Sequence, residues 1–572
     1  MIDGKNKRIK IIIVLANVIL FAFALWKIQL GMHSDEVHSI AVGDMIARGD
    51  TFFKECWFYL QMSAVFTAPV IKIYTLIVGS TDGILLLFRI LSVFIQAGIC
   101  LYFYHTFRER FNKKYTAVAA VILFAFVPDF QSFTYKQEIV WFSIMQIIFT
   151  YQYYWKRAKK YLVLLGIMIS ACVLAYPTSI LQFPIYLGIL CWINKSFDRK
   201  ISDHIRDCAI VSATCVVCAV LFLTVVFQKI SVAEFLEFFP KVFTDDNLDS
   251  SFISKLVHPL KKFAALGFLT VIPVFICRKM KWRKTELSLV MIGALFWMAF
   301  LGQCYIERKG LTWHCVTYPY ALSVFMVPLL YWINGCQKED RAVLMLFELP
   351  AVTVIFCIAL ASNQGNITSM YGGIVSMLAF FLLLGGKERM GETEKIPAVH
   401  KLIIGSVLFF ALTMFAIPVY EQESVYVDNL EWRTVITQRI PVQYGPAKGI
   451  SLGETTFERY NNLCSLIGEH VQSSDAVFIV DDAYTASYGY LCAKGKYATF
   501  SPQGGWGLAT SERAVQYYKD NPQKQPTIVL INLEYIFSEL DDYMTATPVG
   551  VFLTAHDYDM IECKSGYAVL RN

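Results

Sequence analysis

The sequence predicts a polytopic α-helical membrane protein of about 13 spans with a C-terminal extracytoplasmic α/β domain. Of its 572 residues, 56% are hydrophobic and only 17% are charged, whereas about 25% are charged in an average soluble protein. The mean hydropathy is +0.49. Apolar runs close to the length of a bilayer-crossing helix recur through residues 1–419, and residues 420–572 show a different pattern. We therefore divide the chain into a transmembrane part, 1–419, and a tail, 420–572.

Basic clusters set the direction of each span, because lysine and arginine gather in cytoplasmic loops. They occur at 5–10, 108–114, 155–160, 194–200, 277–284, 337–341 and 385–395, and two apolar runs separate each cluster from the next. All of them face the cytoplasm if the N-terminus is cytoplasmic and the tail lies outside. The first run is too long for the apolar core of a signal peptide, so we expect it to be retained. The predicted spans are 11–30, 84–104, 115–128, 139–154, 161–176, 178–193, 207–228, 262–278, 285–302, 318–335, 342–361, 370–385 and 401–419.

The segment 58–79, FYLQMSAVFTAPVIKIYTLIVG, is also apolar and long enough to span. Counting it as a span would move every later basic cluster to the outside, against the charge rule. Gln61, Pro69 and Lys72 also interrupt it. We therefore predict an interfacial or partly re-entrant helix inside a large first outer loop, 31–83.

The tail alternates helical and strand-like patterns. Residues 455–471 and 511–521 have helical periodicity, 475–482 and 526–534 are apolar and strand-like, and a hairpin is predicted about Lys564–Gly566. This alternation predicts a small α/β domain. The stretch DDAYTASYGY (481–490) follows the first strand, where open sheets bind ligands. It is better explained as an ordinary polar turn, so we expect an accessory domain.

Cysteine usage leaves one question open in the tail. Fifteen cysteines are scattered along the chain, most of them inside apolar runs, where free cysteine is commonly buried. Cys464, Cys492 and Cys563 lie in the tail. A pair among them can form a disulfide, but spacing alone does not choose it.

The charge is divided unevenly along the chain. Residues 1–419 carry 40 basic and 26 acidic side chains, a net charge of +14, and residues 420–572 carry 11 and 19, a net charge of −8. The basic excess lies in short inner loops, so it indicates topology in the bilayer and no nucleic-acid partner. These loops leave no room for a cytosolic nucleotide-binding domain, and none has a glycine-rich phosphate loop. Any chemistry is therefore expected at the outer face of the plasma membrane.

Acids and bases gather in the predicted outer loops. Asp35 and Glu36 directly follow the first span, flanked by His33 and His38, which we interpret as surface residues. Arg89 lies about five residues into the second span, where a charge needs a partner or a wet cavity. Each has a structural alternative: adjacent acids often only cap a helix, and a buried arginine often pairs with a structural acid.

Two later outer loops add further candidates. Asp129 lies in VPDFQSFTYKQE (127–138), and Arg308, Lys309 and His314 lie in CYIERKGLTWHCVTYPY (304–320), against the positive-inside trend. A carboxylate can take the proton of an acceptor hydroxyl, and cations can stabilise a phosphate leaving group. Taken alone, Arg308 and Lys309 are better explained by contact with lipid headgroups.

Several of these stretches together resemble one family. The acidic motif DEVH (35–38) follows the first predicted helix, and a Gly-Asp with an aromatic, proline-bearing stretch follows it in 47–70. An arginine lies early in the second span, in 82–92, and the segment VTYPYAL (316–322) opens a late span. This arrangement resembles the GT-C class of polyprenyl-phosphate-sugar-dependent glycosyltransferases, in particular its protein O-mannosyltransferase and aminoarabinose-transferase branch. Within residues 1–130 the resemblance rests on sequence motifs, and in the remainder of the chain it rests mostly on the predicted topology.

The resemblance implies a GT-C-like catalytic domain over 1–419 and an inverting transfer of sugar. By the resemblance Asp35 would be the general base and Glu36 would support donor or acceptor. From the charges of the outer loops themselves, Asp129 is a candidate second acid. Arg89, Arg308, Lys309 and His314 would bind the donor phosphate. Two departures stand out: a His-Pro-Pro-Leu-like element is reduced to FTAPV (66–70), and no arginine adjoins the Tyr-Pro segment. Members of the class differ in using a divalent metal, so the cofactor is left open.

We thus predict transfer of a sugar from a polyprenyl-phosphate donor to an unknown glycan, lipid or protein acceptor. Two alternatives remain. A transporter or flippase of a lipid-linked or acidic solute should show internal repeats and mid-span charges, and this sequence has no repeat and few such charges. A glycan polymerase or ligase would also take its sugar from a lipid-linked donor, but that donor would be a lipid pyrophosphate.

Overall fold

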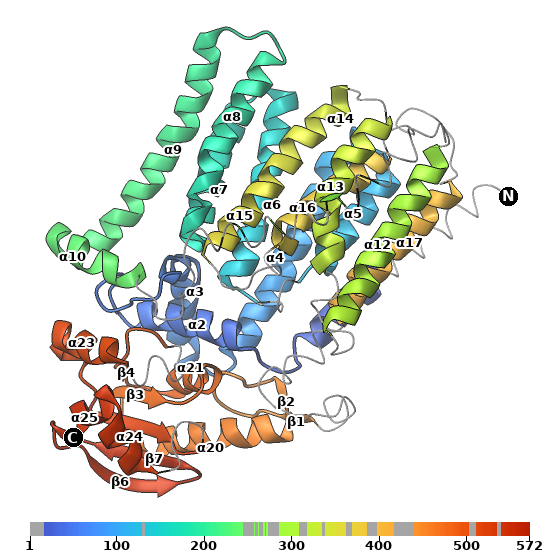
Figure 1. Ribbon diagram of the computed structural model, residues 1–572. Helices are drawn as coiled ribbons and strands as arrows, with labels where there is room; N and C mark the ends of the chain where they lie inside the picture. The colour runs from blue at the N-terminus through green and yellow to red at the C-terminus, as the bar shows by residue number, and fades with distance from the viewer. Residues whose placement is uncertain are drawn as a thin grey trace.

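The computed structural model shows a helical bundle with a domain of helices and strands at one end (Figure 1). Helices α2 (Ser34–Ala47) and α3 (Ala64–Val78) lie between the two parts. The residues that the structure describes are 17–127, 132–243, parts of 255–272, 285–307, 317–334, 338–361, 369–385, 397–416, 439–502, 511–534 and 539–572.

Helices coincide with nearly all of the predicted spans. They are Asn17–Lys27, α4 (Ile84–Phe107), α5 (Lys113–Ala125), α6 (Tyr135–Lys156), α7 (Lys160–Ala175), η2 (Pro177–Leu181) with α8 (Gln182–Lys195), α9 (Ile201–Phe227), α12 (Thr285–Glu307), α13 (Thr317–Asn334), α14 (Lys338–Val343) with a π-helical turn (Leu344–Glu348) and α15 (Leu349–Leu360), α16 (Ser369–Leu384) and α17 (Ala398–Ala416). The predicted span 262–278 lies largely outside the described residues. Four helices in the described part are long and apolar enough to cross a membrane: Gln61–Val78, Ile84–Phe107, Ile201–Phe227 and Asp340–Leu360. The helical architecture is therefore confirmed, and the total of about 13 spans stays a prediction.

The bundle has a buried centre and an apolar outer face. Every residue of α16 is buried, as expected for a helix that is apolar all round. Gly372 and Gly373 allow this, because an added Cβ would lie 2.0 Å from the carbonyl oxygen of Ala351 on α15 and 2.5 Å from that of Tyr320 on α13. In contrast, α9 exposes valines and a leucine along its length, 55% in the case of Val220. Such a face is typical of contact with lipid.

The loop predicted to lie outside, residues 31–83, contains α2, the short 3-10 helix η1 (Gln61–Ser63) and α3. Residues Gln61–Val78 form one of the four helices that are long and apolar enough to span. Our choice of an interfacial helix over a span rests on charge parity and stays a prediction. Helix α2 packs closely on α3, since a Cβ on Gly43 would lie 2.3 Å from Oγ1 of Thr67.

The tail is an α/β unit, as predicted. Its five-stranded sheet has the order β4-β3-β5-β7-β6, with β4, β3 and β5 parallel and β7 antiparallel to both of its neighbours. Strands β3 and β5 are buried along their whole length, which explains their unbroken apolar runs. The strands are β1 (Arg439–Pro441), β2 (Ser451–Gly453), β3 (Ala476–Val480), β4 (Lys496–Tyr497), β5 (Ile528–Asn532), β6 (Asp559–Lys564) and β7 (Tyr567–Arg571).

The helices of the tail also fall where the periodicity placed them. The helices predicted at 455–471 and 511–521 are α20 (Glu454–His470) and α23 (Glu512–Asp520). Further helices are α21 (Ala483–Cys492), η7 (Pro522–Lys524), α24 (Leu540–Ala546) and α25 (Pro548–Thr554). The predicted hairpin joins β6 to β7, and Ser565 and Gly566 turn it with φ angles of 53° and 78°. Glycine adopts this left-handed region without steric cost.

Candidate active site

The acidic pair begins helix α2, between the bundle and the tail domain (Figure 1). Nδ1 of His33 caps the helix by accepting the backbone N–H of Asp35 at 3.2 Å. Asp35 and Glu36 occupy the first turn, where the helix dipole favours negative charge. Consecutive residues on a helix point in directions about 100° apart. The two carboxylates therefore face different surroundings.

Glu36 faces inward and pairs with Arg89 of α4. Nε and Nη2 of Arg89 donate to the two carboxylate oxygens at 2.7 and 2.6 Å, and both side chains are at most 1% exposed. Arg89 also donates to the carbonyl oxygens of Ile28, Leu30 and Gly31 at 2.7, 3.3 and 2.8 Å. These contacts use all five N–H donors of the guanidinium. In this arrangement Arg89 fixes the turn that leads into α2 and has no donor left for a phosphate.

Asp35 faces Lys136, which lies in the first turn of α6. Nζ of Lys136 and Oδ2 of Asp35 are 2.7 Å apart, with Lys136 5% and Asp35 25% exposed. Burial alone would raise the pKa of Asp35, but the charges of Lys136 and His33 outweigh it and lower the pKa to about 2. The site thus presents an ionised, partly accessible carboxylate beside a buried ammonium.

His38 lies one turn further along α2 and is buried. It is 4% exposed, so the interpretation of this residue as a surface histidine is wrong. Its ring meets that of Phe58 edge-on at 4.5 Å, and neither ring nitrogen has a hydrogen-bond partner. Burial lowers its pKa to about 4, so the imidazole is neutral at pH 7.

Four other residues were predicted for the site. Asp129, Arg308, Lys309 and His314 lie outside the described residues, and their roles stay predictions. Lys136 lies in the same predicted loop as Asp129, 127–138, and it was assigned no role from the sequence. Its signal was a lone cation one turn before the apolar run 139–154.

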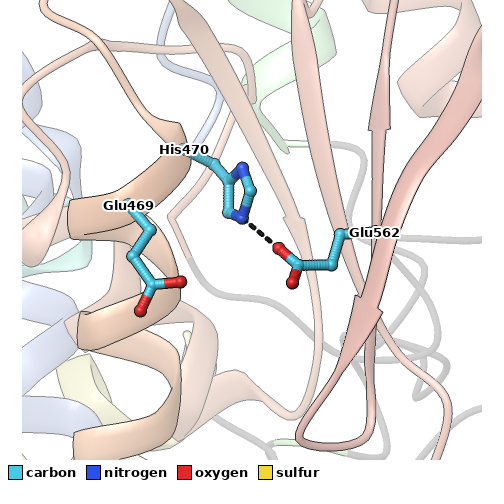
Figure 2. Close-up of side chains that lie close together, drawn as sticks. All are labelled: Glu469, His470 and Glu562. Atoms are coloured by element: carbon cyan, nitrogen blue, oxygen red, sulfur yellow. Dashed lines mark hydrogen bonds and ion pairs between the residues drawn. The ribbon is translucent and has the colours of Figure 1, made fainter.

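The described residues contain one group with donors suited to a metal ion, and it lies in the tail. Glu469, His470 and Glu562 bring ligand atoms within 4.8 Å of one another, between the end of α20 and strand β6 (Figure 2). His470 already bonds Glu562, and Lys564 pairs with Glu469 at 2.7 Å. We interpret this group as an ion-pair cluster that joins helix to strand. It includes no residue of the Asp35 site.

The turn after strand β3 satisfies its own polar groups. Asp481 accepts hydrogen bonds from Asn532 at 3.0 Å, from the backbone N–H of Asp482 at 2.7 Å and from the hydroxyl of Tyr567. Asp482 accepts two from Thr485 at 2.9 Å, one from its backbone and one from its hydroxyl. These contacts agree with the expectation of an ordinary turn.

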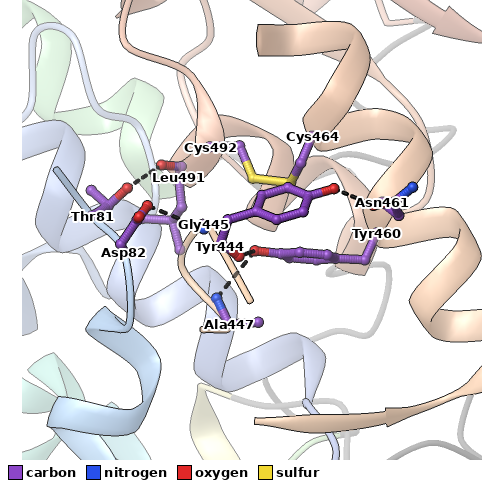
Figure 3. The surroundings of a disulfide bond; sticks show 10 residues. All are labelled: Thr81, Asp82, Tyr444, Gly445, Ala447, Tyr460, Asn461, Cys464, Leu491 and Cys492. Atoms are coloured by element: carbon purple, nitrogen blue, oxygen red, sulfur yellow. Dashed lines mark hydrogen bonds between the residues drawn. A yellow bond between two sulfur atoms is a disulfide. The ribbon is translucent and has the colours of Figure 1, made fainter. Parts of the chain in front are cut away.

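A disulfide answers the question that the cysteine spacing left open. Cys464 of α20 and Cys492 of α21 are bonded, and Cys563 is free and exposed. The bond lies beside Tyr444 and the turn that contacts Asp82 (Figure 3). Disulfides persist in oxidising compartments and are rare in the cytosol.

The resemblance predicted a helical bundle with an α/β domain at one end, and comparison with solved structures confirms this fold. The chain is similar to ArnT from Cupriavidus metallidurans bound to undecaprenyl phosphate, with a TM-score of 0.51 and 10% identity over 98% of this chain and 97% of ArnT. For ArnT in the apo state the values are 0.51 and 11%, over 97% and 98%.

A second solved structure is more distant. The archaeal oligosaccharyltransferase AglB from Archaeoglobus fulgidus, in complex with an inhibitory peptide and a dolichol-phosphate, has a TM-score of 0.45 and 12% identity over 98% of this chain and 74% of AglB. No protein-family model matches the sequence, and no curated protein matches it. At 10–11% identity, the two ArnT structures show a shared fold.

Proposed function

We propose that this chain is a glycosyltransferase that moves a sugar from a polyprenyl-phosphate donor to an acceptor at the outer face of the membrane. The observation that carries the proposal is the partly exposed Asp35 carboxylate, 2.7 Å from the ammonium of Lys136, at the end of a GT-C bundle. ArnT, which shares this fold, is known in a complex with undecaprenyl phosphate. A carboxylate beside a cation suits a reaction that removes a proton and releases a phosphate.

The chemistry we propose is an inverting displacement. The acceptor hydroxyl oxygen attacks the anomeric carbon, the bond from that carbon to the phosphate oxygen breaks, and polyprenyl phosphate leaves. Asp35 takes the hydroxyl proton as general base. Lys136 stabilises the charge that develops on the phosphate. When Lys136 turns toward the phosphate, Asp35 loses part of the field that lowers its pKa and becomes a stronger base.

Glu36 and Arg89 are assigned a positioning role. Their buried pair holds the turn before Asp35, and Arg89 has all its donors in use. We retain Arg308, Lys309 and His314 as phosphate contacts and Asp129 as a second acid.

We also place the tail domain outside the membrane and the N-terminus in the cytoplasm. The charge pattern of the loops and the Cys464–Cys492 disulfide support this orientation. The domain boundary near residue 420 is part of the same proposal.

The test is transfer of radiolabelled sugar from a panel of polyprenyl monophosphate sugars in membranes. Native protein should transfer label, and Asp35→Asn should transfer at least about a hundredfold less, the low end of a general-base contribution. Lys136→Met should also lose activity, with weaker use of the donor. Asp541→Asn, which changes an exposed acid of the tail, is the matched control.

Each other outcome has a defined meaning. Equal transfer by native and Asp35→Asn protein would remove Asp35 as the base. Activity only with pyrophosphate donors would favour the polymerase or ligase. No transfer from any donor would favour a transporter and overturn the proposal.

A further inference from the structure

The tail domain is fastened to the loop that carries Asp35 by a buried ion pair. Lys524 of η7 bonds Asp50, which lies just after α2, and the two side chains are 4% and 10% exposed. Lys524 also donates to the carbonyl oxygen of Tyr497 at 3.3 Å. A buried charge requires such a partner, because removal of one member leaves the other uncompensated. The two residues belong to segments 474 positions apart, so this pair is a contact between domain and loop.

A second contact holds the last turns of α2 itself. Oδ2 of Asp44, a residue only 2% exposed, accepts from Nε of Arg48 and from the hydroxyl of Tyr497, both at 2.7 Å. Nη1 of Arg48 donates to the carbonyl oxygens of Ala493 and Gly495 at 2.6 and 2.7 Å. Three tail residues, Ala493, Gly495 and Tyr497, are therefore joined to the end of α2 through one guanidinium and one carboxylate.

Backbone hydrogen bonds join the tail to both sides of α2. Before the helix, the N–H of Gly31 donates to Ser451 at 2.9 Å, and the N–H of Ser451 donates to Gln29 at 2.7 Å. After the helix, the N–H of Trp57 donates to Phe500 at 2.9 Å. The tail thus contacts the chain that enters α2, the end of α2 and the chain that leaves it.

We infer that the tail domain is a positioning element for the transfer reaction, with Tyr497 and Lys524 as positioning residues that set the orientation of α2 and so of Asp35. This inference rests on the proposed function and replaces the expectation of an accessory domain. Arg89 holds only the first turn of α2, at Glu36. Loss of the contact at Asp44 leaves the last turns of α2 held by packing against α3, and we expect a small rotation about Glu36.

The size of the effect follows from the helix geometry. A rotation of about 10° moves a carboxylate about 5 Å from the pivot by about 1 Å. A misplacement of about 1 Å can lower a rate about a hundredfold. Loss of tail contacts should therefore reduce kcat although neither Tyr497 nor Lys524 touches the reacting groups.

The experiment compares full-length native protein with Tyr497→Phe and Lys524→Met. Hydrogen exchange of residues 34–48, followed by mass spectrometry, measures how firmly α2 is held. We expect exchange to quicken about tenfold or more in both variants, since each loses a hydrogen bond to a buried charged group. Transfer assays should show a lower kcat with little change in KM for the donor, and Lys524→Arg should restore much of the loss.

Lys564→Met is the matched control, because it breaks an exposed ion pair within the tail, with Glu469. It should change neither readout. Unchanged exchange in Tyr497→Phe and Lys524→Met would overturn the inference, as would quickened exchange with full kcat. If Asp35→Asn loses transfer and the two tail variants keep it, the positioning role of the tail is refuted and the proposed function stands. If native protein transfers nothing, the proposed function fails and the positioning role fails with it, whereas exchange still reports whether the tail holds α2.

Discussion

Replacing Arg89 with methionine leaves the Glu36 carboxylate without its cation in a place that water does not reach. The pair is at most 1% exposed, and Arg89 also satisfies the carbonyl oxygens of Ile28, Leu30 and Gly31. Breaking a buried pair by removing one partner costs about 3–5 kcal/mol. Each carbonyl oxygen left without a donor adds at least about 1 kcal/mol where water cannot replace that donor. We therefore expect Arg89→Met to lose at least about 4 kcal/mol of unfolding free energy.

The assay is equilibrium unfolding in mixed detergent micelles, with the double variant Arg89→Met, Glu36→Gln completing a cycle. The double variant removes both charges, so it should recover about 2 kcal/mol relative to Arg89→Met. Arg199→Met, at an exposed arginine between α8 and α9, should stay within about 0.5 kcal/mol of native. A loss below about 1 kcal/mol in Arg89→Met, or no recovery in the double variant, would refute the reasoning.

Three further predictions concern other parts of the chain. Burial lowers the pKa of His38 from its ordinary 6.5 to about 4. The unfolded chain therefore binds a proton that the folded chain does not, and the unfolding free energy should fall by up to about 3 kcal/mol as the pH drops from about 6.5 to about 4. Unfolding measured at pH 7.5 and at pH 4.5 should show this loss in native protein and not in His38→Gln. The disulfide closes a separation of 28 residues, so Cys464→Ser with Cys492→Ser should lose about 3–4 kcal/mol by chemical denaturation, and an unchanged midpoint would contradict the bond. Val220→Asp places a charge on the exposed face of α9 at a cost of about 3 kcal/mol, so membrane insertion should drop relative to Val220→Ala, and equal insertion would show that this face does not meet lipid.

The architecture could be predicted from the sequence because a helix that crosses a bilayer and a strand buried in a sheet each require an apolar run of characteristic length. Apolar runs marked helices such as α4 and α9, and the runs 475–482 and 526–534 marked β3 and β5. Both signals are local, since burial on all sides requires unbroken apolar residues. The helix predicted within residues 58–79 is also present, as Gln61–Val78. Whether it crosses the bilayer or lies at its surface depends on the surrounding lipid and water, which helix periodicity does not report.

The sequence singled out the candidate acids Asp35 and Glu36 but not the cations that pair with them, and the catalytic roles stay predictions. Asp35 and Glu36 stood out as adjacent charges after an apolar run, yet their cations lie 101 and 53 positions away. Arg89 was selected for a phosphate because a charge inside a span needs a partner, and the sequence does not say which. Lys136 was passed over for the same reason. Pairing across a fold is a long-range property that residue types alone do not specify.

The backbone hydrogen bond between Gly31 and Ser451 has a consequence for the order in which contacts form during synthesis. Ribosomes add about 5–20 residues per second, so the partners of the first outer loop emerge roughly 20–100 s after the loop itself. During that interval α2 has its Arg89 contact but no tail to hold its far end. The contacts that hold the far end of α2 are therefore completed only after the tail has been made, and a product truncated before residue 451 would lack them.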